Sequence, residues 1–321
     1  MTADLSARRG FARYTWLVLA YTVAVVLWGA VVRATGSGAG CGSHWPACNG
    51  QVVLRAPSLE TLIEFTHRAT SGILGPMVIA MVWMAWRRFP KGHPARAGAV
   101  ASLILTLTEG AVGAALVKLE LVAHNASVWR AAAMAVHLTN TFLLLGALAL
   151  TGWWASGRPA VRLRGQGAAG ALMISAVVLT ILVGAMGAVT ALGDTLFPKT
   201  SMGFELSAVH FLERLRVVHP IAAIGTGIFV ALSGRMVRRL RPGRETERLS
   251  TALVALFGLQ VMAGTVNVVL LVPVWMQLVH LLLADALWIT LVLTAASVLA
   301  AEPRAEAAPL PEPASPRPAA V

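Results

Sequence analysis

The chain reads Leu62-Ile63-Glu64-Phe65-Thr66-His67-Arg68 at the start of a long apolar run, so we expect this stretch to lie inside a membrane. An acid, a histidine and an arginine within five residues are costly there, and such groups usually mark a functional site. Glu64 and His67 are three residues apart, which places them on one face of a helix. That face would present an imidazole to a metal with a carboxylate beside it. The alternative is an interfacial helix end whose charged side chains extend to water.

The composition of the whole chain is that of a membrane protein. Of its 321 residues, 57% are hydrophobic and only 12% are charged, whereas a soluble domain has about 25% charged residues. The net charge of +12 is also compatible with nucleic-acid binding. We exclude that class because the basic residues fall in short loops between apolar runs, where the positive-inside rule places them. The composition therefore predicts an integral membrane protein that contacts lipid and no nucleic acid.

Eight apolar runs are each long enough to cross a bilayer. They predict an all-α integral membrane protein with transmembrane helices at about residues 14–32, 60–86, 97–117, 131–154, 167–192, 208–233, 250–272 and 274–300. The first run is long enough to span, so no cleavable signal peptide is expected. Residues 1–13 should form a short basic cytoplasmic tail. Residues 301–321, rich in Pro, Ala and Glu, should form a disordered cytoplasmic tail.

The basic residues set the predicted orientation. The two tails and the even-numbered loops hold 18 of the 26 lysines and arginines, which predicts that both termini are cytoplasmic in a cell membrane. The glycine-rich loop between the first two spans, which holds both cysteines, then faces outward, where a disulfide can persist. The most basic loop is expected after the sixth span, with Arg235, Arg238, Arg239, Arg241, Arg244 and Arg248.

The two halves of the chain repeat each other. The matched segments are Val136-His137-Leu138 with Val279-His280-Leu281, and Glu109-Gly110-Ala111-Val112-Gly113 with Gln260-Val261-Met262-Ala263-Gly264. Because four spans return the chain to the same side, the repeats should be related by an axis along the membrane normal. We therefore expect two repeated four-helix bundles, formed by residues 14–157 and 158–300.

Four histidines occupy matched places on the even-numbered spans: His67, His137, His219 and His280. Each lies six to eleven residues from the outer end of its span, which is roughly 9 to 16 Å below the outer surface. Two imidazoles in an apolar bundle suit bis-histidine heme ligation, whereas zinc prefers three or four ligands. Any one of them is as readily a core imidazole bonded to a carbonyl. Four at one depth, in both repeats, favour ligation.

The other histidines, His44, His93, His124 and His210, lie in loops or at helix ends and are expected to be solvated. His210 precedes His219 by nine residues, so the ligand on the sixth span stays open between these two. Small residues on the spans would let a porphyrin approach the backbone, or simply allow close helix packing. The glycines concerned are Gly72, Gly75, Gly110, Gly113, Gly146, Gly225, Gly227 and Gly264.

Several of these segments together resemble the heme A synthase family. They are Gly29-Ala30-Val31-Val32-Arg33-Ala34-Thr35-Gly36-Ser37-Gly38, Cys41, Trp45-Pro46, Cys48-Asn49-Gly50-Gln51 and Glu64-Phe65-Thr66-His67-Arg68. The segments 260–268 and 280–285 fit the same family, and the resemblance covers essentially all eight spans. It is most specific in the first half of the chain.

The resemblance implies an oxidoreductase that converts heme O into heme A for cytochrome oxidase. Two successive hydroxylations oxidise the C8 methyl group of heme O to a formyl group. The first half would hold heme O between His67 and His137, and the second half would hold a heme b cofactor between His219 and His280. Glu64 matches the family's catalytic acid, and a desolvated carboxylate can exchange protons with a substrate. Its alternative role is only to pair with Arg68.

The resemblance also bears on the loop and on two further charged residues. Cys41 and Cys48 match an outer-loop pair that can form a disulfide, either structural or redox-active. Arg68 is a candidate contact for a heme propionate, or it reaches the interface. Glu109 departs from the family, because a glutamine would be more usual there, and its role is open. The outer loop after the fifth span, residues 193–207, lacks the second pair of cysteines that some members have.

Two other classes of function share these features. A non-catalytic di-heme membrane cytochrome would carry the same four histidines, and a heme transporter or chaperone would have the same pockets without chemistry. Glu64 beside His67 favours the enzyme. Hand-over of an apolar substrate makes heme O synthase, the protoheme farnesyltransferase, a plausible partner. The sequence leaves the electron acceptor unidentified.

Overall fold

The computed structural model describes residues 2–198 and 210–300, which form eight long α-helices and one short 3₁₀ helix, η1 (Ser37–Ala39). All eight long helices have the length and composition to cross a membrane. They are α1 (Thr2–Ala34), α2 (Leu59–Arg88), α3 (Pro94–Lys118), α4 (Val128–Ala155), α5 (Gly167–Leu196), α6 (Phe211–Leu240), α7 (Arg244–Val269) and α8 (Val274–Ala300). The predicted class, an all-α multi-pass membrane protein with eight spans, is confirmed.

Three helices extend well past the predicted spans. One is α7, which begins at Arg244 rather than near residue 250, so that Arg244 and Arg248 of the predicted loop are helical. The first, α1, begins at Thr2 rather than near residue 14, so the predicted basic tail is helical. The sixth, α6, ends at Leu240 rather than near residue 233, which moves Arg235, Arg238 and Arg239 from the predicted loop onto the helix. Arginine is a good helix former, so a helix continues where the apolar pattern stops. The predicted disordered tail, residues 301–321, lies outside the described residues. So does most of the outer loop predicted at residues 193–207.

Polar side chains cap the helices at both ends of the molecule. Ser58 Oγ accepts a hydrogen bond from the backbone N–H of Thr61 at the start of α2, and Ser127 Oγ accepts one from Arg130 at the start of α4. At the start of α3, His93 Nδ1 accepts from Ala95 N–H. Each cap satisfies a backbone donor that the helix itself leaves without a partner.

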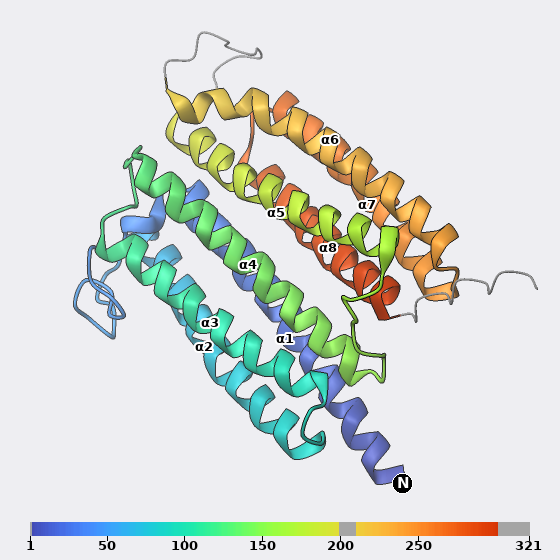
Figure 1. Ribbon diagram of the computed structural model, residues 1–321. Helices are drawn as coiled ribbons and strands as arrows, with labels where there is room; N and C mark the ends of the chain where they lie inside the picture. Colours follow the sequence, from blue (N-terminus) through green and yellow to red (C-terminus); the bar gives the residue numbers. More distant parts are fainter. Residues whose placement is uncertain (1, 199–209, 301–321) are drawn as a thin grey trace, which may run out of the picture.

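The helices form two four-helix bundles that lie side by side (Figure 1). In each bundle, neighbours in sequence are also neighbours in space, and the first helix contacts the fourth. Consequently α2 stands diagonally opposite α4, and α6 stands diagonally opposite α8. The bundles meet through α1 and α4 of the first half and α5 and α8 of the second. The predicted repeat of two four-helix bundles is confirmed.

The centre of the interface between the bundles is aromatic. Phe142 of α4 stacks on Trp288 of α8, with ring centroids 5.0 Å apart. Trp288 Nε1 donates a hydrogen bond to the backbone carbonyl of Phe142 at 2.6 Å, and both side chains are buried. A stacked pair whose only polar atom has a partner stabilises the contact without a desolvation penalty.

A half-buried arginine joins the halves at the end of the molecule that carries the cysteine loop. Arg33, at the end of α1, donates to the carbonyl of Ala191 at 2.7 Å and to Thr195 Oγ1 at 2.6 Å, both on α5. Its second terminal nitrogen donates to Gln277 Oε1 on α8 at 2.7 Å. One side chain of the first half therefore binds two helices of the second.

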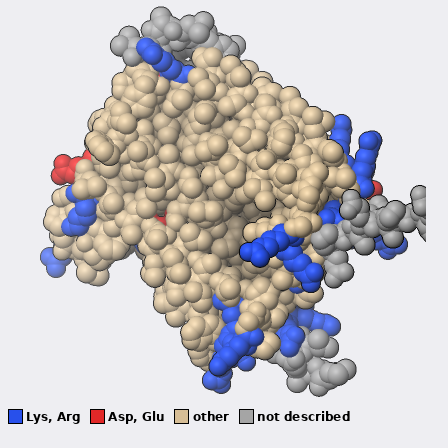
Figure 2. Space-filling model, viewed as in Figure 1, with Lys and Arg blue, Asp and Glu red and all other residues tan. Residues whose placement is uncertain are grey.

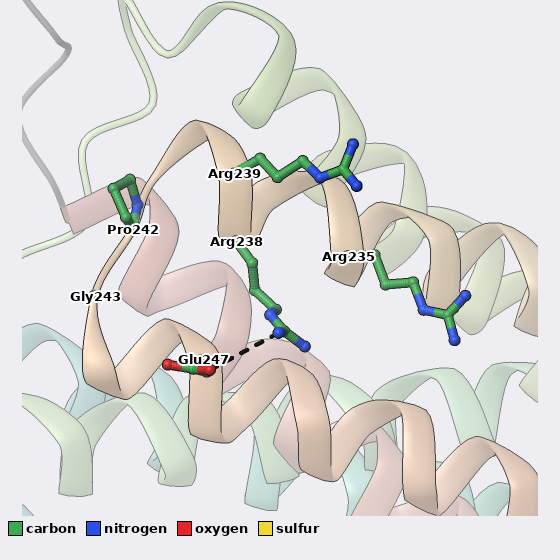
Figure 3. Close-up of a pocket in the computed structure, with 6 residues that line it drawn as sticks. All are labelled: Arg235, Arg238, Arg239, Pro242, Gly243 and Glu247. Carbon is green, nitrogen blue, oxygen red and sulfur yellow. Dashed lines mark ion pairs between the residues drawn. The ribbon is translucent and has the colours of Figure 1, made fainter.

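Charged side chains gather away from the helix faces. In Figure 2 most Lys and Arg side chains lie toward the end of the molecule where α1 begins and α6 ends, and the broad face between is nearly free of charge. A cavity of about 420 Å³ at this end is lined by Arg235, Arg238, Arg239, Pro242, Gly243 and Glu247 (Figure 3). Arg238 lies 3.8 Å from Glu247. This cavity contains none of the predicted site residues.

Candidate functional site

The four predicted histidine ligands lie at one depth. His67, His137, His219 and His280 follow the first residues of α2, α4, α6 and α8 by eight, nine, eight and six positions. At 1.5 Å per residue they are about 9 to 14 Å along their helices from the same end of the molecule. The four helices start at that end and run in one direction. Because each histidine lies a similar number of residues after the start of its helix, the four lie at a similar depth.

The histidines come in pairs, one pair in each bundle. His67 and His137 are on the diagonal helices α2 and α4, and a charge on one imidazole would act on the other. His219 and His280 are related in the same way on α6 and α8. Imidazoles from diagonal helices project into the interior of a bundle from opposite sides, which is the arrangement that bis-histidine ligation requires.

A glycine on a neighbouring helix lies against three of the four imidazoles. A Cβ on Gly29 of α1 would lie 3.0 Å from Cε1 of His67, and one on Gly187 of α5 would lie 2.9 Å from Cε1 of His219. On α7, a Cβ on Gly264 would lie 3.1 Å from Cε1 of His280. The backbone of an odd-numbered helix thus supports each of these three rings at a distance that leaves little space for a Cβ.

These glycines predict a selective effect on heme retention. Gly29→Ala is expected to crowd the His67 ring and weaken heme binding in the first half about tenfold, because overpacking costs about 1 to 3 kcal/mol. Gly10→Ala on the same helix is the matched control, since a Cβ there would meet Arg88 at an ordinary 3.6 Å. Heme content per purified protein checks this. Equal heme content in both variants would show that Gly29 does not position the ring.

The surroundings of the histidines fit a flat macrocycle held by two ring nitrogens. A Cβ on Gly72 or Gly75, five and eight residues after His67, would meet open space, as would one on Gly225, six residues after His219. The same holds for Gly110 and Gly113 on α3. In contrast, Gly146 packs against Trp288 and Gly227 against Phe257. The predicted glycines therefore divide into five beside open space and three in close packing, Gly264 included.

The Nδ1 atoms of the four histidines are also compatible with the predicted heme ligation. Nδ1 of each of the four histidines is buried without an aligned hydrogen-bond partner in the described part of the chain. Within residues 2–198 and 210–300, no three His, Cys, Asp or Glu side chains gather as they would around a zinc ion. Paired imidazoles with room beside them are compatible with the predicted heme ligation, which stays a prediction.

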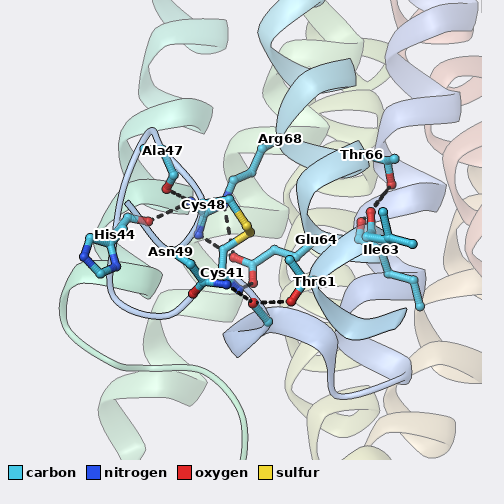
Figure 4. Close-up of a disulfide and its surroundings, with 12 residues drawn as sticks. Cys41, His44, Ala47, Cys48, Asn49, Thr61, Ile63, Glu64, Thr66 and Arg68 are labelled. Atoms are coloured by element: carbon cyan, nitrogen blue, oxygen red, sulfur yellow. Dashed lines mark hydrogen bonds and ion pairs between the residues drawn. A yellow bond between two sulfur atoms is a disulfide. The ribbon is translucent and has the colours of Figure 1, made fainter. Parts of the chain in front are cut away.

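Glu64 is buried and held by three hydrogen bonds (Figure 4). Its Oε2 accepts from the backbone N–H of Cys41 at 2.8 Å. Its Oε1 accepts from Arg68 through Nε at 3.1 Å and through Nη2 at 2.5 Å. The predicted ion pair with Arg68 exists, whereas the backbone donor at Cys41 was not predicted. The carboxylate is therefore fixed between α2 and the cysteine loop.

Arg68 anchors the same loop. Its Nη1 donates to the carbonyls of His44 at 2.7 Å and Ala47 at 3.0 Å (Figure 4). Four of the five guanidinium N–H groups are thus engaged by Glu64 and the loop. One N–H on Nη2 remains for the predicted propionate contact, which stays a prediction.

The loop can approach α2 because residue 40 is glycine. A Cβ on Gly40 would lie 2.5 Å from the backbone carbonyl carbon of Glu60, a separation that no side chain tolerates. Instead, the Gly40 carbonyl accepts from Thr61 Oγ1 at 2.7 Å, and the next residue, Cys41, presents its N–H to Glu64. Cys41 and Cys48 form the disulfide that closes this loop, and both are buried. The burial favours the structural role over the redox-active one.

The remaining histidines occupy ordinary places. His210 is the N-cap of α6, where its Nδ1 accepts from the backbone N–H of Leu212 and its ring contacts Phe197 and Phe211. It thus lies at the helix end, whereas His219 lies at the common depth. His44 and His124 are exposed, as expected. His93, predicted to be solvated, is half-buried beside Phe89.

The two halves differ at the position three residues before the first ligand. Glu64 precedes His67 in the first half, and Arg216 precedes His219 in the second. Arg216 pairs with Asp194 at 2.7 Å and also donates to the carbonyls of Gly193 and Phe197. An acid three residues before the histidine is therefore a feature of the first half.

Two charged residues within the spans, Arg33 and Asp285, have surroundings in the structure that the sequence did not predict. Arg33 was quoted only within a family segment, and nothing local shows that it reaches α5 and α8. Asp285 on α8 is fully buried, and neither carboxylate oxygen has a hydrogen-bond partner in the described residues. The available signal was an ionisable residue inside an apolar span, which is by itself a reason to expect a role.

Comparison with known proteins identifies relatives that carry two different names. Two proteins of Thermus thermophilus, each named protoheme IX farnesyltransferase, are 53% identical to the chain over 293 residues. The aligned region is 90% of this chain and 48% of each Thermus protein, so the chain spans about half the length of these relatives. The heme A synthase of Alkalihalophilus pseudofirmus is 43% identical over 93 residues, which are 29% of this chain and 31% of that protein.

The family model that matches covers far more of the chain than the heme A synthase alignment. It is the COX15-CtaA model, described as cytochrome oxidase assembly protein, and it matches residues 12–292. This region runs from α1 into α8 and includes all four histidines of the paired site. The chain belongs to the COX15-CtaA family of cytochrome oxidase assembly proteins.

Proposed function

We propose that the chain is a heme A synthase, an oxidoreductase that converts the C8 methyl group of heme O into the formyl group of heme A. The observation that carries this proposal is the pairing of four histidines at one depth on diagonal helices, with a buried Glu64 beside one pair only. The relatives named heme A synthase support it.

Each pair of imidazoles has its own role in this proposal. His67 and His137 would hold the substrate heme O, and His219 and His280 would hold a heme b cofactor. The assignment to halves follows from Glu64, since substrate chemistry needs an acid and the matching position of the second half is Arg216. Heme b in the second half supplies one-electron redox chemistry when bound.

The reaction removes electrons from the substrate carbon in two rounds. Each hydroxylation takes an oxygen atom from water, replaces one C–H bond of the methyl group by C–OH, releases two protons and passes two electrons to an acceptor, which is not identified. Loss of water from the resulting geminal diol leaves the formyl group. Glu64, held by Cys41 N–H and Arg68 between the loop and α2, would accept and release a proton in each round.

A protoheme farnesyltransferase is the proposed source of the substrate. The Thermus relatives carry that name, and the region matched by this chain is only 48% of their length. Direct hand-over would keep the apolar farnesyl chain of heme O within the membrane. We place both termini in the cytoplasm and the disulfide loop outside, because the tails and even-numbered loops hold 18 of the 26 basic residues.

The test is a heme extract from cells that make heme O, with and without this protein, resolved by chromatography and mass. We expect a new formyl heme that is absent when His67→Ala replaces the native chain. His124→Ala, at an exposed loop histidine, is the matched control and should leave the product unchanged. Unchanged heme O beside a purified protein with a bis-histidine spectrum would contradict the synthase and favour a di-heme electron carrier.

A further inference from the structure

Three side chains of α4 converge on Glu109, an acid in the apolar part of α3. Asn140 Nδ2 donates to its Oε2, and Thr141 Oγ1 donates to its Oε1. His137 Nδ1 lies 3.2 Å from Oε1. That separation is a hydrogen-bond distance, although its angle falls outside strict hydrogen-bond geometry.

The carboxylate is held in place by the protein itself. Asn140 also donates to the carbonyl of Leu105 at 2.9 Å, and its Oδ1 accepts from Thr108 Oγ1 at 2.7 Å. Its amide is therefore fixed between α3 and α4 and cannot turn away from Glu109. With Thr141 on the other oxygen, the carboxylate has little freedom to rotate, and Oε1 stays against the His137 ring.

The second half has an amide at the matching position. Gln260 of α7 corresponds to Glu109, and its Nε2 lies 3.2 Å from Nε2 of His280. A carboxylate only accepts hydrogen bonds, whereas a side-chain amide donates and accepts and carries no charge. The repeat thus gives His137 and His280 partners of the same size and different chemistry, on different ring nitrogens.

We propose that Glu109 is a positioning residue for His137 that distinguishes the heme of the first half from that of the second. By accepting a hydrogen bond from Nδ1–H of His137, Glu109 fixes the tautomer whose Nε2 lone pair is free for iron. It also makes this imidazole a stronger electron-pair donor to iron than the imidazole of His280. A stronger donor stabilises ferric over ferrous iron. This inference rests on the proposed function, since it requires a heme in each half.

The test compares four forms of the full-length protein purified from cells that make heme O: native, Glu109→Gln, Gln260→Glu and the double exchange. Redox titration followed by absorbance gives the midpoint of each heme, and His67→Ala and His219→Ala assign the two midpoints to the halves. Glu109→Gln should raise the reduction equilibrium constant of the first-half heme about tenfold, which is about 59 mV for one electron. Gln260→Glu should leave the first-half midpoint unchanged, because Gln260 lies against His280 in the other half, and the double exchange should shift the first-half midpoint as Glu109→Gln does.

The outcomes separate this inference from the proposed function. A first-half midpoint that rises in Glu109→Gln, with the second-half midpoint unchanged, supports the positioning role, because a purely structural residue would not shift one midpoint selectively. Two hemes with unchanged midpoints and unchanged heme content in Glu109→Gln would overturn only this inference. Native protein purified without heme would overturn the proposed function and this inference with it.

Discussion

Replacing Glu64 by glutamine is expected to lower the rate of formyl heme formation by at least 100-fold while leaving heme bound. General acid–base groups contribute typically 10² to 10⁴-fold to a rate. Glutamine keeps the length of the side chain and one acceptor oxygen, which replaces Oε1 or Oε2 and not both. Arg68 still donates to the carbonyls of His44 and Ala47, so the loop should remain docked. The loss would then report the missing proton and not a displaced loop.

The measurement is the rate of heme A formation per bound heme, with heme content and thermal midpoint determined on the same samples. Glu60→Gln is the matched control, because Glu60 lies one turn earlier on α2 and is exposed. Its activity should stay close to that of the native chain. Normal conversion by Glu64→Gln would remove Glu64 as the catalytic acid, and loss of heme together with activity would point to a structural role.

The second large effect concerns stability. Arg33→Leu is expected to lower the free energy of unfolding by about 2 to 4 kcal/mol. Hydrogen bonds to a charged group contribute about 1.5 to 3 kcal/mol each. Removing the half-buried cation recovers part of its desolvation cost, which offsets some of that loss. The lost bonds are those to Ala191, Thr195 and Gln277, so the contact between the two bundles should weaken first.

Thermal unfolding in detergent, together with protease sensitivity of the turn between α4 and α5, checks this expectation. Arg33→Lys should fall between Arg33→Leu and the native chain, since an ammonium keeps the charge and cannot reproduce the fork geometry. Arg9→Leu on the exposed part of α1 is the matched control and should change stability by about 0.5 kcal/mol or less. An Arg33→Leu protein that unfolds like the native chain would show that aromatic packing alone holds the halves together.

The sequence by itself determined the eight spans, their repeat and the depth of the four histidines. These features are local: the length of an apolar run decides whether it spans, and the distance of His67 or His280 from the end of its run decides its depth. The helix ends were less well determined. Hydropathy reports the part of α1 and α6 inside lipid, and both helices continue through arginines beyond it.

Only the tertiary structure decided which groups meet. That α2 and α4 are diagonal, and that Glu64 accepts from Cys41 N–H, are contacts between segments that no local pattern specifies. The bond from Arg33 to Gln277 joins residues 244 positions apart, and Glu109 reaches His137 only because α3 packs against α4. Polar side chains inside a membrane must find partners within the protein, and packing of whole helices determines which partners are in reach.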